Sequence, residues 1–191
     1  MDETAISNLA LDILKEAPIS SINDDRAVAL WLKRNFAVQR DAALSMANWN
    51  FALKRQIIAA DAVPPAFGWD HGYTLPAGCV RLLPLTHDGS DEGSPIAHVV
   101  EGGKLLTNMA GPAKIRFVNR ATNYDAYHPL FIDYLSGRLA RRMAHWLTGK
   151  SSYVEIANGL MREAWEDAWR TDAIEGDTPR AADDDWIEAR G

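Results

Sequence analysis

The feature that most constrains the fold is a change in residue pattern along the chain, from helical periodicity to frequent proline and glycine and back. Two stretches with helical periodicity flank residues 64–129, which hold most of the nine prolines and thirteen glycines, with short apolar runs between them. Frequent proline and glycine of this kind are typical of short strands and turns. The sequence therefore predicts a helical body into which a small β region is inserted.

Two helices are expected before the insertion. In the first, apolar residues recur at helical spacing over 6–17, Asp2 or Thr4 provides the cap, and Pro18 ends the helix. The second runs from a cap at Asn23 or Asp24 to about residue 47, and the short link predicts antiparallel packing of the two. Its expected inward face consists of Val28, Trp31, Leu32, Val38, Ala42, Ala43 and Met46.

Within the insertion, the pattern predicts strands and one clear hairpin. Residues 49–60 are expected to begin as a strand, and 113–118 form another. The runs 96–101 and 104–107 are joined by Gly102-Gly103, which supplies the positive φ angles that a two-residue turn needs.

Two further helices are expected after the insertion. Pro129 suits the first turn of one of them, which ends near Gly149. Ser151 or Ser152 caps the other, which ends at Gly176. The apolar faces comprise Phe131, Ile132, Leu135, Leu139, Met143, Trp146 and Leu147 in the third helix, and Tyr153, Ile156, Ala157, Leu160, Met161, Ala164, Trp165 and Ala168 in the fourth.

Together these elements predict a mainly α, α+β fold: a four-helix bundle with an inserted small antiparallel β subdomain and an extended C-terminal arm. The arm carries more acids than arginines and has no periodicity, which predicts disorder in isolation. The expected divisions are an N-terminal helical hairpin (1–60), a β-rich insertion (61–128), a C-terminal helical hairpin of the same bundle (129–176) and the arm (177–191).

Composition limits the classes of partner. Lys and Arg number 20 against 26 Asp and Glu, a net charge of −6, which argues against sequence-independent binding to phosphates. Cys79 is the single cysteine, so an intrachain disulfide and a cysteine-rich zinc site are excluded. No apolar run approaches the length of a membrane span, and the acidic start at residues 1–3 lacks the basic residues of a signal peptide.

No catalytic, metal or cofactor site is expected. The Gly102-Gly103-Lys104 sequence lacks the first glycine and the Ser or Thr of a phosphate loop. The acids and histidine around residues 87–92 match no known metal-binding spacing. Cys79 has no obvious base nearby and is expected to be a small buried side chain.

Two groups of residues are candidates for binding. Arg138, Arg141 and Arg142 share one arc of the third helix, and this arc is either a solvated face, a surface that pairs with carboxylates of a neighbouring subunit, or a nucleic-acid contact. In the arm, Trp186 is either part of a disordered tail or an anchor that orders on a partner, because Trp and Arg are the residue types most frequent at binding hot spots.

Several segments carry a family resemblance through their order and spacing: NWNFALKR at 48–55, YTLPAGCVR at 73–81, IRFVNR at 115–120 and WIEAR at 186–190. Together they resemble the head-to-tail adaptor (connector) proteins of tailed bacteriophages, most closely the tail tubular protein A type of short-tailed phages. The resemblance covers nearly the whole chain. Many members have proline before the tryptophan of the first segment, where this chain has Asn48.

The resemblance implies a structural virion protein and not an enzyme. It implies a homo-oligomeric, dodecameric ring at the head-tail junction, made in the host bacterial cytoplasm, that docks on the portal protein. The ring would extend the DNA channel, let double-stranded DNA pass without specific binding, and provide the attachment platform for a tail nozzle or tail tube. The resemblance assigns portal binding to Trp186, Ile187 and Arg190. It leaves the contacts between subunits to Arg138, Arg141 and Arg142. No membrane is expected to take part.

Alternatives stay open at this point. A small cytoplasmic helical enzyme or regulatory module, with a ligand pocket in the β region, would predict converging polar groups there and a dispensable tail. A connector of a long-tailed phage, or of a phage-derived particle, would bind a portal in the same way, so the sequence does not separate it from the adaptor of a short-tailed phage.

Overall fold

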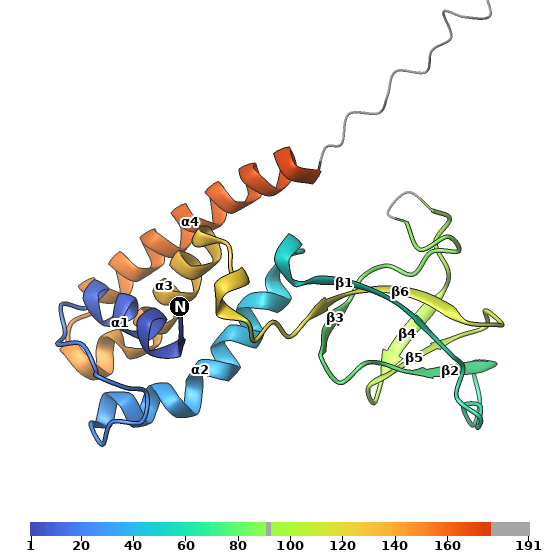
Figure 1. The fold of residues 1–191 in the computed structure, drawn as a ribbon, viewed down its shortest axis with the longest axis horizontal. Helices are drawn as coiled ribbons and strands as arrows, with labels where there is room; N and C mark the ends of the chain where they lie inside the picture. The colour runs from blue at the N-terminus through green and yellow to red at the C-terminus, as the bar shows by residue number, and fades with distance from the viewer. Residues whose placement is uncertain (91–92, 177–191) are drawn as a thin grey trace, which may run out of the picture.

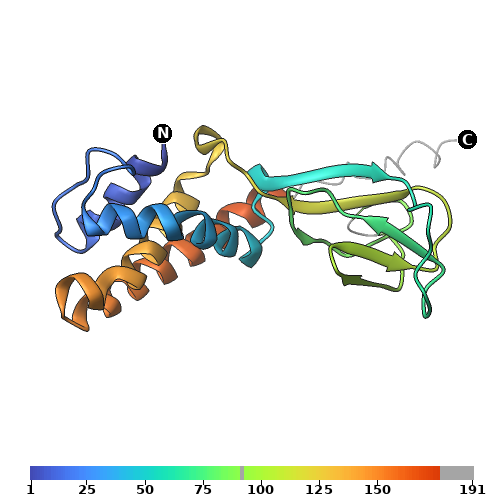
Figure 2. The same ribbon diagram turned by 90° about the horizontal axis from the view of Figure 1, so that it is seen from below.

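The computed structural model describes residues 1–90 and 93–176. Over these residues the chain forms four α-helices and two three-stranded antiparallel sheets, which makes it an α+β protein. The helices gather at one end and the sheets at the other, as Figures 1 and 2 show. The predicted insertion of a β region between helical segments is confirmed at this level.

The first helix, α1 (Glu3–Ile13), begins where the sequence predicts but ends earlier. The Asp2 carboxylate accepts a hydrogen bond from the backbone N–H of Ala5 at 2.8 Å, which confirms one of the two expected caps. The helix ends at Ile13 and not at Pro18, because the backbone turns at Lys15 with a φ of 57°. The N–H groups of residues 14–16 return to the last carbonyls of the helix and close it.

The second helix, α2 (Ala27–Met46), begins later than predicted. Asp24 does not cap it, since its carboxylate accepts from the backbone N–H of Ser20 at 3.0 Å. The expected inward face is wrong in part, because the side chains of Val38 and Met46 are 61% and 54% exposed. The side chains that are buried are Val28, Ala29, Leu32, Phe36, Gln39, Arg40, Ala43 and Leu44.

Helix α3 (Pro129–Thr148) follows the predicted boundaries, and α4 (Ser152–Gly176) begins as predicted and reaches Gly176, the last described residue. Pro129 opens α3, where its missing N–H costs nothing. Gly149 ends it in the left-handed region, with a φ of 65°.

Helix α3 is the common partner of the other three helices. It is buried on most sides between residues 131 and 140. Gly137 lets α4 approach closely, since a Cβ at this position would lie 2.8 Å from Cγ of Met161. The core of the helical body therefore forms around α3, with α1, α2 and α4 placed about it.

The β region consists of two sheets with separate strand orders. The first, ordered β1-β6-β3, pairs β1 (Leu53–Ile58) with β6 (Ala113–Asn119) and β6 with β3 (Cys79–Leu82). The second, ordered β2-β5-β4, contains β2 (His71–Thr74), β5 (Lys104–Thr107) and β4 (His98–Glu101). A short 3-10 turn, η1 (Asn50–Ala52), leads into β1, and a second, η2 (Tyr124–Ala126), lies before α3.

The β4–β5 hairpin is the predicted one. Gly102 and Gly103 have φ angles of 55° and 77° and join the strands as a two-residue turn. Between the sheets lies a small core of its own, distinct from the helical core, made of Ile58, Tyr73, Leu85, Leu105, Ala113, Ile115 and Phe117.

Candidate functional site

The three arginines predicted for subunit contacts lie in the second half of α3 and differ in exposure. Arg138 is half-buried, and its Nε donates a hydrogen bond to Oε1 of Gln39 on α2 at 3.0 Å. Arg141 and Arg142, one turn further along, are exposed. One arginine of the arc thus has a contact within the chain, while the other two lie on the surface.

These arginines lie in the gap between α2 and α4. The hydrogen bond between Arg138 and Gln39 shows that the side of α3 bearing Arg138 lies next to α2. The preceding residue, Gly137, faces Met161 of α4. Arg142 follows Arg138 by four residues and so lies on the same face. The arginines of α3 therefore lie between α2 and α4, on the side of α3 that faces away from α1.

The flanks of this gap add apolar and basic side chains. On α2, Val38 and Met46 are exposed. On α4, Arg162 is exposed and lies one turn before Trp165, on the flank that turns toward the end of α2. We call this surface the basic face; it consists of Val38, Met46, Arg138, Arg141, Arg142 and Arg162.

A pocket of about 180 Å³ closes the basic face at the end nearest the β region. Its walls include Met46, Trp49 and Trp165, with Arg81 of β3 at the rim. The guanidinium of Arg81 donates to Oδ1 of Asn48 at 2.6 Å, which ties β3 to the residue after α2. The lining of the pocket thus combines two tryptophans and a methionine with one cation, Arg81.

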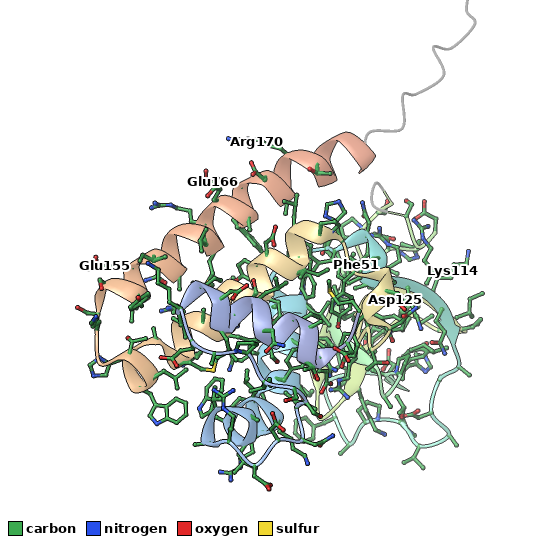
Figure 3. All side chains as sticks on the ribbon, turned by 60° about the vertical axis from the view of Figure 1, so that its left-hand side comes forward. Phe51, Lys114, Asp125, Glu155, Glu166 and Arg170 are labelled. Atoms are coloured by element: carbon green, nitrogen blue, oxygen red, sulfur yellow. The ribbon has the colours of Figure 1, made fainter. Side chains whose placement is uncertain are left out.

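On the other flank of α4 lies a hollow of about 390 Å³ between α1, α3 and α4. Figure 3 views the molecule from the side on which α1 lies, with α4 above it. The lining of the hollow combines the partly exposed Leu9 and Leu160 with four carboxylates. We call it the acidic face; it consists of Leu9, Asp12, Asp133, Leu160, Glu163 and Asp167.

The acidic face was not predicted from the sequence, although a signal for it exists. On α4, Ile156, Leu160, Glu163 and Asp167 are spaced by four, three and four residues, which places them along one flank of a helix. The apolar members of this stripe were assigned to the core, but Ile156 is 49% and Leu160 40% exposed. The buried stripe of α4 is narrow, consisting of Ala157, Met161, Ala164 and Ala168, so the flanks of the helix are left to solvent.

A polar cluster connects the helical body to the β region. Asp41 of α2 forms ion pairs with the neighbouring Arg40 and with Arg120, which follows β6, both at 2.7 Å. Arg40 is buried, at 5% exposed, and interacts with the hydroxyl of Tyr124, which donates to the carboxylate of Glu3. This cluster has a structural use, because it joins α1, α2 and the chain between β6 and α3.

Large apolar side chains are also exposed on the β region. In the proline-rich loop between β1 and β2, Phe67 is 88% and Val63 76% exposed, and Ile57 of β1 is 65% exposed. Shallow hollows of about 360 Å³ and 240 Å³ lie near these residues. The larger is lined by Val63, Pro64, Pro65, Gly72, Glu101, Gly102, Lys104 and Leu106.

No protein-family model matches the chain, and no curated protein matches it.

The remaining predicted site residues, Trp186, Ile187 and Arg190, lie outside the described residues. Within residues 1–90 and 93–176, no three His, Cys, Asp or Glu side chains are placed to share a metal ion. In the same part of the chain, no helix is apolar over a length that would cross a membrane. Cys79 is half-buried, and burial raises the pKa of its thiol.

Proposed function

We propose that this chain is a structural virion protein: a head-to-tail adaptor whose copies form a ring on the portal vertex of a tailed phage. The ring, expected to be dodecameric, extends the DNA channel and is the attachment platform for the tail nozzle or tail tube. The finer architecture expected from the sequence belongs to this proposal: the four helices act as one bundle, the β region is its insertion, and residues 177–191 are the arm that reaches the portal.

The observation that carries the proposal is the amount of apolar side chain left uncovered at both ends of the molecule. Val38, Met46 and Trp146 are exposed on the helical body, and Val63 and Phe67 on the β region. Uncovered apolar patches of this kind are typical of surfaces that bind other proteins. A component that touches neighbours in a ring and partners above and below needs several such surfaces, whereas an enzyme of this size needs one concave site.

The charge of the chain is compatible with a conduit for DNA. A net charge of −6 gives few cations to neutralise phosphates. The exposed arginines of α3 and α4 lie in a gap that also holds apolar side chains, which suits a protein partner better than a phosphate backbone. DNA then passes through the ring without being held.

The test is binding to the cognate portal ring, with the bound copies counted by mass photometry. The full-length chain is expected to form a ring on the portal, and a chain ending at Gly176 is expected to lose binding. A full-length variant with Trp186→Ala, Ile187→Ala and Arg190→Ala separates the side chains from the length of the arm, and it is also expected to lose binding. The matched control, Glu188→Gln, changes the same segment and is expected to bind as the wild type does.

Failure of the full-length chain to bind the portal would refute the adaptor proposal. The alternative, a small helical enzyme or regulatory module, then gains weight, and a ligand screen directed at the β region becomes the next measurement. If both the truncated chain and the triple variant still bind the portal, the proposed ring is retained, and the proposed role of residues 177–191 in portal binding is rejected.

A further inference from the structure

The two flanks of α4 carry opposite charge. Toward α1, Leu160, Glu163 and Asp167 line the acidic face together with Asp12 of α1 and Asp133 of α3. Toward α2, Arg162 lies one turn before Trp165, which lines the pocket at the end of the basic face, and it also lies one turn before Glu166, so the basic face borders the acids of the outer surface of α4. Carboxylates therefore gather on one side of α4, in the hollow with α1 and α3, and exposed arginines of α3 and α4 lie on the other side.

Each face also combines its charge with uncovered apolar side chains. On the acidic face, Leu9 and Leu160 are 37% and 40% exposed, and Ile156 beside them is 49% exposed. On the basic face, Val38 and Met46 are exposed to a greater degree. Apolar contact provides affinity when such surfaces meet, while complementary charge selects the partner and its orientation.

The outer surface of α4 separates the two faces. Figure 3 shows Glu155, Glu166 and Arg170 along this helix, pointing away from the body. This surface is polar and mixed in charge, and Arg170 is paired with Asp167 at 3.1 Å. The exposed apolar side chains of α4 therefore lie toward the acidic face, and one carboxylate of that face, Asp167, is already paired with Arg170 of the outer surface.

We propose that the acidic face of one copy binds the basic face of the next copy. The occupant is a second copy of this chain, because each face offers the charge that the other lacks and both carry uncovered apolar side chains. The inference rests on the proposed ring and specifies which surfaces form it. Since the faces differ and lie on opposite flanks of one helix, the contact is heterologous, the type that closes into a ring and not into a two-fold dimer.

The arginines thereby acquire distinct roles. Arg138 holds α2 against α3 through Gln39 and positions the face. Arg142 and Arg162 are exposed and reach the neighbour's carboxylates, Asp133 and Glu163, which are exposed as well. Arginine suits this role because its planar guanidinium binds a carboxylate through two parallel hydrogen bonds.

The test reverses each face separately and then combines the two changes. The acidic face is reversed by Asp133→Lys with Glu163→Lys, and the basic face by Arg142→Glu with Arg162→Glu. Self-association is measured by sedimentation velocity as concentration is raised, at low and at high salt. Thermal melts followed by circular dichroism establish that each variant is folded.

The wild type is expected to associate, and less so at high salt, since charge attraction between exposed groups is screened. Each reversal is expected to lower the association constant by at least about tenfold, because like charges then meet across the contact. An equal mixture of the two reversed variants is expected to associate again, since each reversed face meets its complement on the other variant.

Matched controls make the same change of net charge on the β region. Lys54→Glu with Arg55→Glu matches the basic-face reversal, and Glu101→Lys with Asp70→Lys matches the acidic-face reversal; all four side chains are exposed. Both controls are expected to associate as the wild type does. Equal loss in a control and in its matched reversal would show an effect of net charge alone and overturn the proposal.

Three other results would overturn the proposed interface: a wild type that stays monomeric at every concentration, a reversed variant that associates like the wild type, or a mixture that fails to recover. The outcome is separable from that of the portal experiment. A chain that associates through these faces but never binds the portal refutes the adaptor function alone. A chain that forms rings on the portal despite a reversed face refutes the interface alone.

Discussion

Trp49 lies where α2, α3 and α4 meet, and it has two roles there. Its ring is 6% exposed and packs edge-on against Phe131 and Trp165, with centroids 4.9 and 6.0 Å away. Its Nε1 donates to the carbonyl of Ala43 at 3.0 Å. That carbonyl belongs to the last turn of α2, where no backbone N–H is available to it, so the indole completes the end of the helix.

Replacing Trp49 separates these contributions. Trp49→Phe keeps a ring but loses the hydrogen bond, and it is expected to lower the free energy of unfolding by about 1–2 kcal/mol. Trp49→Ala also empties the aromatic site and is expected to cost about 3–5 kcal/mol. The measurement is urea denaturation, with Trp146→Phe as control, since Trp146 is 52% exposed. A Trp49→Phe variant as stable as the wild type would contradict the role given to the hydrogen bond, and equal losses for the two Trp49 variants would contradict the role given to the packing of the ring.

Among the elements, the contact between α3 and α4 depends on one glycine. A Cβ on Gly137 would lie 2.8 Å from Cγ of Met161 and 3.5 Å from the carbonyl oxygen of Ala157. Since glycine is unfavourable in the middle of a helix, its use here is offset by the close approach it permits. A Cβ on Gly159 of α4 would meet no other atom within 4 Å, so this second glycine permits no such approach.

The two glycines should therefore respond in opposite directions. Gly137→Val is expected to force α4 away from α3 and lower the free energy of unfolding by about 2 kcal/mol. Gly159→Ala is expected to raise it by about 0.5–1 kcal/mol through helix propensity alone. Thermal or urea unfolding of the two variants checks both values. A stable Gly137→Val variant would show that the helices do not pack through this position.

The boundaries of α3 and the start of α4 were predictable because Pro129 and Gly149 mark the two ends of α3, and Ser151 precedes α4. The hairpin was predictable because two consecutive glycines readily adopt the positive φ angles that a two-residue turn needs. The inward face of α2 was not, since its apolar residues surround the helix and only tertiary packing decides that Phe36 is buried while Val38 is exposed.

The candidate faces follow the same division. The arginine arc was visible as a cluster on one helix, but the bond from Arg138 to Gln39 joins residues 99 positions apart, which periodicity does not reveal. The acidic face combines carboxylates from three helices. The pattern of each helix shows its own carboxylates, but it does not show that the three sets lie next to one another. Where side chains from several elements converge, only the packing of those elements determines the surface.

At the scale of the whole molecule, one polar cluster joins both regions to the N-terminus. It links Glu3 of α1, Arg40 of α2, and Tyr124 before α3. Arg120, directly after β6, enters through Asp41 at 2.7 Å. The orientation of the β region relative to the helical body, and hence of any ring built from them, depends in part on these hydrogen bonds and ion pairs.

The cluster should make the molecule sensitive to alkaline pH. Burial, together with the hydrogen bond to Glu3, raises the pKa of Tyr124 from 10.0 to about 12, although Arg40 opposes the shift. The folded state therefore holds this proton more tightly than the unfolded state does. The resulting stabilisation is complete below pH 10 and is lost as the pH rises toward 12. Tyr127 acts in the same direction, since burial also raises its pKa.

Tyr124→Phe has no proton to lose and is expected to show a smaller fall in the urea midpoint between pH 10 and 12 than the wild type does. The double variant with Tyr127→Phe is expected to show the smallest fall. Both variants should be less stable than the wild type at neutral pH, by about 1 kcal/mol for each hydroxyl lost. Tyr153→Phe, on α4 away from the cluster, is the control and should keep the wild-type profile. If Tyr124→Phe follows the wild-type profile as well, alkaline unfolding begins elsewhere, and this cluster is not what holds the two regions together.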